Sequence, residues 1–191
     1  MTRLHTGRLV LTPEEAGFIP GDPRALMERL GEIGLIAGRL NGKDDRFLSG
    51  EEFIRLIDFM GCSPSIQLDP TPSGEPFCHL AVCGPYDEPR FLRGRNTTPP
   101  HCEQCRKRIP DWEPIMQAWE EAPENYLAEC PHCAHRQNPS SYNWRQNAGC
   151  GRFLLTVENI FPHEAMPSPT LMKTLRETSG NQPWHHFYVQ D

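Results

Sequence analysis

The 191-residue sequence contains no apolar run long enough to cross a membrane. A membrane-spanning helix needs roughly 20 consecutive, mainly apolar residues, and the longest apolar runs, such as residues 153–157, are far shorter. The first residues, Met1 to His5, lead into no apolar segment and no small-residue cleavage site of the kind that marks a secretory signal. We therefore expect a cytoplasmic protein that has no membrane partner.

Motifs that are typical of enzymes are missing as well. The sequence has no nucleophile elbow, no glycine loop that would cradle a phosphate and no His-Glu-x-x-His helix. The segment Cys130-Pro131-His132-Cys133 approaches the Pro-Cys-x-x-Cys half of a zinc deaminase motif, but its proline lies between the cysteines instead of before them. The sequence therefore predicts no catalytic residues, and we do not expect an enzyme.

Repeats of fixed period and low-complexity tracts are also absent, and the composition is that of a globular chain. Hydrophobic residues make up 37% of the sequence, which is enough to bury a core without disulfides at this length. Helix caps followed by proline or glutamate predict helices at residues 13–18, 23–33, 50–60 and 169–179. Apolar runs between turn signals predict strands at residues 65–68, 77–83, 90–93, 152–160 and 185–190. This order favours an α+β fold, an antiparallel sheet with helices packed on it.

What the sequence does contain is two close pairs of cysteines. They are Cys102, Cys105, Cys130 and Cys133. Two residues between cysteines let one tight turn present both sulfurs to the same metal ion, and the chain between the pairs is long enough to loop out and return. We predict that these four residues bind one structural Zn²⁺ ion, with no coordination position left open for water.

Around these pairs, over residues 100–137, the chain resembles the zinc-ribbon and rubredoxin-like fold group. In that group two such turns face one another, and the second commonly reads Cys-Pro-x-Cys. Arg106 and Ala134 stand where the group often has a glycine with a positive φ, so we expect turns of slightly different shape. Iron stays an alternative to zinc, because it accepts the same four thiolates.

The stretch that holds both pairs can be removed between two predicted strands. We therefore predict a zinc-ribbon insert at residues 97–151 on a platform made of residues 1–96 and 152–191. A helix at residues 111–120, with apolar side chains spaced along one face, joins the two cysteine pairs.

Basic residues gather in sequence around the first pair, although the whole chain has a formal charge of −6. They are Arg90, Arg93, Arg95, Arg106, Lys107 and Arg108, and nearby aromatic residues are Trp112, Trp119, Tyr142 and Trp144. Such a set suggests phosphate contacts and base stacking. Alternatively, the basic residues offset the negative charge of a zinc ion with four thiolates. We take Arg93, Arg95, Arg106, Lys107 and Arg108 as candidate partner-binding residues.

Other cysteines and histidines carry weaker hypotheses. A second metal site would need Cys78, Cys83, Cys150, His79, His185 and His186. Neighbouring residues of a strand, such as Cys78 and His79, point to opposite faces, so we expect ordinary thiols instead. Cys62 is expected to be a packed small residue. His101, His132 and His135 are expected on the surface of the turns, with a role in tuning the metal site as the alternative.

The aromatic segment at residues 183–190 is predicted to be a final strand that anchors the core. The alternative is an exposed strand edge that binds a partner by strand addition.

Taken together, these features favour a non-enzymatic zinc-ribbon protein that acts as a protein-interaction adaptor or assembly factor. A nucleic-acid-binding regulator or accessory factor that uses the basic residues is the alternative, and the net acidity of the chain argues against it. The third hypothesis is a rubredoxin-like electron carrier with iron bound by the four cysteines.

Overall fold

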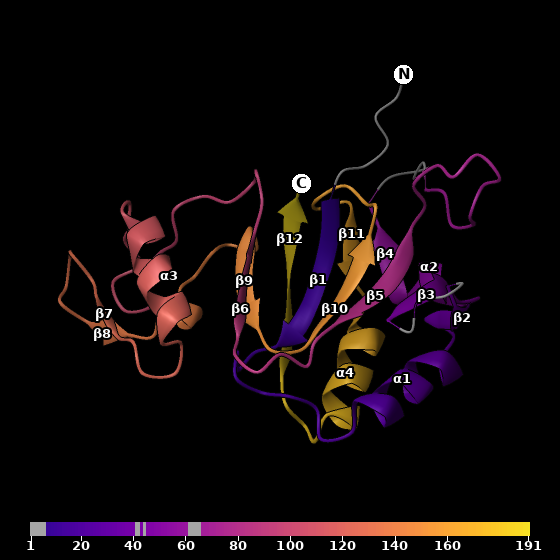
Figure 1. Cartoon of the computed structure of the whole chain (residues 1–191), viewed down its shortest axis with the longest axis horizontal. Helices are drawn as coiled ribbons and strands as arrows, with labels where there is room; N and C mark the ends of the chain where they lie inside the picture. Colours follow the sequence, from indigo (N-terminus) through magenta and orange to yellow (C-terminus); the bar gives the residue numbers. More distant parts are fainter. Residues whose placement is uncertain (1–6, 41–42, 44, 61–65) are drawn as a thin grey trace.

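The computed structural model describes residues 7–40, 43, 45–60 and 66–191, and a six-stranded sheet lies at its centre (Figure 1). The strands are β1 (Gly7–Pro13), β2 (Ile36–Arg39), β3 (Arg46–Ser49), β5 (His79–Cys83), β10 (Leu154–Glu158) and β12 (Trp184–Gln190). Their order is β12-β1-β10-β5-β3-β2, and every neighbouring pair is antiparallel. With helices packed on it, the sheet confirms the predicted α+β class.

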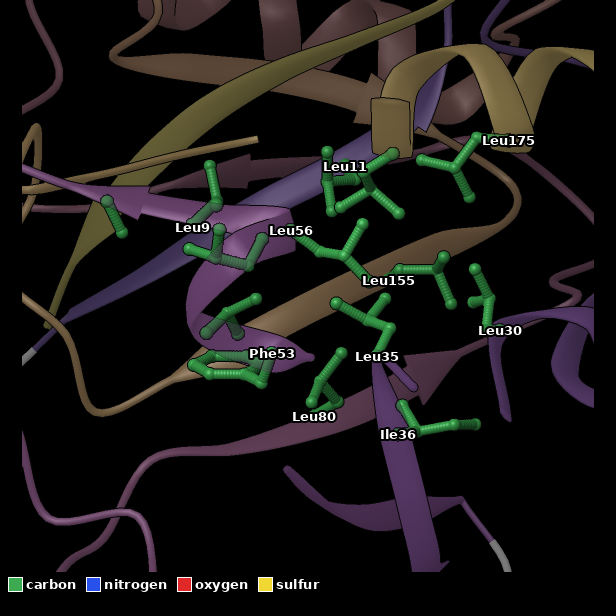
Figure 2. Close-up of a cluster of buried hydrophobic side chains, with 14 of the residues drawn as sticks. Leu9, Leu11, Leu30, Leu35, Ile36, Phe53, Leu56, Leu80, Leu155 and Leu175 are labelled. Atoms are coloured by element: carbon green, nitrogen blue, oxygen red, sulfur yellow. The ribbon is translucent and has the colours of Figure 1, made fainter. Parts of the chain in front are cut away.

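Helices cover one face of this sheet. They are α1 (Pro23–Glu32), the single turn α2 (Phe53–Leu56) and α4 (Pro169–Thr178). Side chains alternate between the faces of a strand, and Leu9 and Leu11 of β1 point to this face, where they are fully buried. Figure 2 shows them in one cluster with Leu30 of α1 and Leu175 of α4. Burying each such side chain contributes about 2 kcal/mol. Since this aliphatic cluster contains more buried side chains than the other clusters of the described residues, it is the main core.

The caps that predicted α1 and α4 are formed. The side chain of Asp22 accepts a hydrogen bond from the Ala25 N–H at 2.9 Å, and Ser168 Oγ accepts one from the Leu171 N–H at 3.2 Å. In both helices proline occupies the first turn, where its missing N–H costs nothing. Within the described ranges, every helix is too short or too polar to span a membrane.

A second, two-stranded sheet packs on the other face. It pairs β6 (Arg90–Arg93) with β9 (Ala148–Gly151) in antiparallel register. Leu92 of β6 contacts a small cluster that includes Val10, Leu154 and Phe187 of the large sheet. A side chain at Gly149 of β9 would collide with the ring of Phe187, so β9 crosses directly over β12 there.

The chain between β6 and β9, residues 94–147, forms an arm beside the sheets. It holds α3 (Trp112–Glu121), β7 (Ala128–Glu129), β8 (Arg136–Gln137) and a 3₁₀ turn (Pro139–Ser141). Figure 1 shows α3, β7 and β8 separated from the large sheet by β6 and β9. The arm has its own core, in which Trp112, Met116 and Trp119 of α3 are buried. This helix confirms the one predicted at residues 111–120, whereas the proposed domain boundaries stay a prediction.

Two predicted helices are wrong. Residues 13–18 begin at the end of β1 and continue into turns, because the Glu14 N–H donates to the Pro183 carbonyl at 2.8 Å and extends the strand pairing. Residues 50–60 form only the turn α2, followed by β4 (Ile57–Phe59), which pairs with β11 (Ala165–Pro167). Tertiary pairing thus overrides an apolar pattern that also fits a helix.

The strands are predicted more successfully. Those at residues 77–83, 152–160 and 185–190 correspond to β5, β10 and β12, and the one at residues 90–93 is β6, although it lies outside the large sheet. Residues 66–68 form no strand, and Ser65 and Cys62 lie outside the described residues.

Candidate metal centre

The two cysteine turns have the same backbone hydrogen bonds. In the first turn the Arg106 N–H donates to the Cys102 carbonyl at 2.9 Å, and the Cys102 N–H donates to the Lys107 carbonyl at 3.0 Å. The second turn repeats these bonds at the equivalent positions around Cys130, with lengths of 3.0 and 2.8 Å. Two segments far apart in sequence therefore present their cysteines in the same local conformation.

Both turns contain a non-glycine residue in the left-handed conformation. Arg106 has a φ of 59° and Ala134 a φ of 58°. These are the positions where zinc-ribbon turns often carry glycine, and the two side chains accept the conformation at a cost of about 1 kcal/mol each. The turns thus adopt the backbone that glycine would allow, and the expected difference in shape does not occur.

The four sulfurs form a compact cluster. All the ligand atoms of Cys102, Cys105, Cys130 and Cys133 lie within 4.8 Å of one another. The Sγ atoms of Cys102 and Cys133 are 3.8 Å apart, as are those of Cys105 and Cys130. Metal–sulfur bonds of about 2.3 Å in a tetrahedron give sulfur–sulfur edges of about 3.8 Å, whereas a disulfide needs about 2.05 Å. The cluster is therefore suited to one tetrahedral metal ion.

The electrostatics of the cluster also favour a cation. Burial raises the pKa of Cys130, but hydrogen bonds from the backbone N–H groups of His132 and Cys133, together with those from the sulfurs of Cys133 and Cys102, outweigh it and lower that pKa to about 7. The N–H of His135 lowers the pKa of Cys133, but desolvation and the three neighbouring sulfurs raise it to about 12. One thiolate therefore forms readily, and its negative charge disfavours ionisation of the neighbouring thiol. A divalent cation offsets the repulsion between the thiolates, because it stabilises all four of them at once.

Side chains around the sulfurs tie the two turns together. The buried side chain of Gln137 accepts the Glu103 N–H at 3.3 Å and lies 3.5 Å from the Cys102 sulfur. The ring nitrogen Nε2 of His132 is 2.9 Å from the carbonyl oxygen of Arg108, so the second turn contacts the first. His132 is exposed and His135 half-buried, but His101 is buried, which corrects its predicted surface position.

A His-x-Glu spacing precedes the second cysteine pair, at His101 and Glu103. Zinc deaminases use this spacing for a metal ligand and a general acid or base. Here Cys102, the residue between them, supplies the clustered sulfur, and His101 is not part of the cluster. Four protein sulfurs complete a tetrahedral shell, which leaves no position for the water that a catalytic zinc needs.

The second metal site suggested by the sequence is not formed. Among the described residues, only the four clustered cysteines are grouped closely enough to hold an ion. Cys78 lies in the main core and Cys150 in the arm core. Burial raises the pKa of both thiols, that of Cys78 to about 12. These two cysteines are therefore inert packing residues.

The basic residues and the aromatic residues do not form one surface. Trp112, Trp119, Tyr142 and Trp144 are at most 8% exposed, in the arm core, so they cannot stack on bases. Arg93 pairs with Glu113 at 3.2 Å and lies over the Trp112 ring, and the Arg95 N–H donates to the Gln190 carbonyl. The candidates on the first turn, Arg106, Lys107 and Arg108, are exposed. The prediction that these aromatic residues stack on bases is therefore wrong. Phosphate contacts by the basic residues stay a prediction.

A cleft of about 590 Å³, which the sequence did not predict, lies between the arm and the first half of β12. Arm residues 140–146 line one side, and β12 residues 184–187 with Met172 of α4 line the other. The arm reaches the cleft through a tight turn in which Arg145 and Gln146 both have a positive φ, 49° and 62°. No short motif marks these residues, because the cleft arises from packing between segments far apart in sequence.

Comparison with known proteins adds no relative. The chain matches no family model, and no curated protein or solved structure matches it significantly.

Proposed function

We propose that the four clustered cysteines bind one zinc ion and that this zinc is structural. Four thiolates saturate the tetrahedral shell that zinc prefers, which suits a structural ion and leaves no site for substrate. In this proposal the chain is a non-enzymatic adaptor or assembly factor, and the zinc holds the arm rigid as a surface for another protein.

One observation carries this proposal: the wall of the cleft is joined to the first metal turn. The His101 N–H donates to the Asn143 carbonyl at 2.9 Å, and the Asn143 N–H donates back at 3.1 Å. His101 directly precedes the clustered Cys102. A metal ion that orders the turn thereby also orders the residues that face the cleft.

The first test is metal analysis of protein purified without added metal. The proposal expects one zinc per chain and a colourless protein. Iron, with the colour of a ferric tetrathiolate, would support an electron carrier instead, because the geometry of the four sulfurs accepts either ion.

The second test concerns the partner. A photo-crosslinking amino acid at Arg145, on the cleft side of the arm, should capture a partner protein, and removal of zinc by a chelator should abolish this capture. The matched control is the same amino acid at Arg55, an exposed residue of α2. Equal capture at both sites, or capture that survives zinc removal, contradicts the proposal.

The nucleic-acid alternative now depends on exposed basic side chains without stacking aromatic residues, and Arg106, Lys107 and Arg108 are consecutive and exposed on the first turn. It predicts salt-dependent binding of an oligonucleotide that is lost in the double variant Arg106→Glu, Lys107→Glu while the zinc content stays unchanged. Absence of such binding by the wild-type protein rules it out.

A further inference from the structure

The strand β12 lies at one end of the large sheet, and half of its outer edge is already occupied. The Tyr188 N–H donates to the Gln146 carbonyl at 2.8 Å, and the Tyr188 carbonyl accepts from Asn96 at 2.9 Å. Asn96 also accepts the Gln190 N–H, and the Gln190 carbonyl accepts the Arg95 N–H. The arm thus covers the edge from Tyr188 to the end of the strand.

The other half of the same edge is open. In an antiparallel strand, alternate residues direct their backbone N–H and C=O groups to the same side. Because Tyr188 and Gln190 direct theirs outward, Trp184 and His186 do so too. No backbone hydrogen bond joins these two residues to a neighbouring element on that side, within the part of the chain that the structure describes.

The cleft lies at this open half. Its lining includes residues 184–187 of β12, so the cleft borders the stretch of edge whose backbone groups are unpaired. Trp184 belongs to the core on the helix side of the sheet, where Met172 of α4 is partly buried. Phe187 points to the opposite face, toward β9. The cleft therefore has a wall on each side of the strand edge, which is the shape that one added strand needs.

The walls of the cleft carry both polar and apolar groups. Its charged side chains include Glu14, Glu103 and Arg145, of both signs. The Nδ1 atom of His185 is buried without a hydrogen-bond partner among the described residues. Burial, followed by the nearby His186, lowers the pKa of His185 to about 4, so its ring is neutral near pH 7. A ligand here is recognised mainly through hydrogen bonds, with no demand for one sign of charge.

We propose that the cleft binds an extended segment of a partner protein, which adds as a strand to the open edge of β12 beside Trp184 and His186. The inference rests on the proposed function, since it names the surface through which the adaptor would bind. A second copy of this chain fits poorly, because only the edge of residues 184–187 is open and the arm stands beside it.

A selection of short random peptides displayed on phage, against the zinc-loaded full chain, supplies the probe. The test compares the affinity of a selected peptide for His186→Pro and for His186→Ala. Proline removes the outward N–H but leaves the pairing with β1 intact, because that N–H does not face β1. Alanine keeps the N–H and, like proline, removes the ring contact between His186 and Gln146. We expect about a tenfold loss of affinity for proline relative to alanine, the value of one good hydrogen bond.

A second measurement does not depend on the proline variant folding. Methylation of successive backbone nitrogens of the selected peptide should weaken binding at every other position, since only alternate residues of an added strand donate to β12. Equal affinities for the two variants when both are folded, a methylation profile without this period, or failure to select any peptide overturns the inference.

These failures can be told apart from failure of the proposed function. If zinc is bound and the Arg145 crosslink depends on it, but His186→Pro retains full peptide affinity, the adaptor role stands and strand addition is wrong. If the chain instead forms a dimer that His186→Pro dissociates, the open edge is used by a second copy and the inference is also wrong.

Discussion

The large sheet with its helices, which we call the platform, and the arm have cores of different kinds. The platform buries a large aliphatic core between a six-stranded sheet and three helices, with Leu9, Leu30 and Leu155 almost fully buried. The arm has one ten-residue helix, two strands of two residues each and a small aromatic core. So small a unit rarely folds on hydrophobic burial alone. In the function that we propose, the metal ion bound by the four cysteines stabilises the arm, as the aliphatic core stabilises the platform.

The two sides of the cleft belong to these two different parts of the molecule. The cleft uses β12 of the platform as one side and residues 140–146 of the arm as the other. In our proposal the core holds the first side and a bound metal ion the second, so each side can be perturbed while the other is observed.

The largest effect is expected from loss of a buried metal ligand. Cys130→Ser should abolish stoichiometric zinc binding and unfold the arm while the platform stays folded, because structural zinc in small domains contributes about 10 kcal/mol. Zinc analysis and limited proteolysis measure the two consequences. Cys150→Ala is the matched control, since Cys150 is buried in the same arm core but lies outside the cluster. If the control loses zinc equally, the cluster is not the binding site.

A cavity in the platform core should lower the stability of the platform and leave zinc binding unchanged. Leu155→Ala removes a side chain that is 2% exposed in the main core, and we expect a loss of about 3 kcal/mol in the free energy of unfolding of the platform. Zinc affinity should change less than twofold. Chemical denaturation gives the first value and a zinc titration the second. A marked fall in zinc affinity would show that arm and platform do not fold independently.

The pH dependence of stability should identify His185. Its folded-state pKa, about 4, lies below the ordinary value of 6.5, mainly because of burial. The unfolded chain therefore binds a proton that the folded chain does not, and stability falls as the pH drops from 6.5 toward 4. His185→Gln should remove about 2 kcal/mol of that fall, measured by denaturation of the zinc-loaded protein at pH 7 and pH 5. An unchanged pH profile would mean that the ring is not buried as described.

The smallest effect is expected beside the metal centre. Gln137 holds the first turn by accepting the Glu103 N–H beside Cys102, so Gln137→Ala should weaken zinc affinity about tenfold without changing the number of zinc ions bound. Competition with a chromophoric chelator measures the affinity. Gln146→Ala, at the cleft end of the arm, should leave it unchanged.

Local signals explain what could be predicted from the sequence. The cysteine turns and the caps at Asp22 and Ser168 each depend on residues a few positions apart. Their physical causes are contained in short segments, so spacing alone reveals them.

Contacts between distant segments explain why other features could not be predicted from the sequence. The strand β1 is buried on both faces, so it has no alternating pattern, and its end resembles a helix start. The strand β6 was predicted correctly, but nothing in its four residues indicates that it pairs with β9 rather than with the large sheet. The cleft depends on how the arm packs against β12, which no motif encodes.

The most direct test of the account is to titrate the metal-free chain with zinc and follow hydrogen exchange of the backbone amides. The account predicts that one zinc per chain protects amides of the arm, residues 94–147, including those at residues 140–146 beside the cleft, and leaves the platform core unchanged. An arm that is already protected without metal, or that stays unprotected when one zinc is bound, would contradict a structural role for the four cysteines.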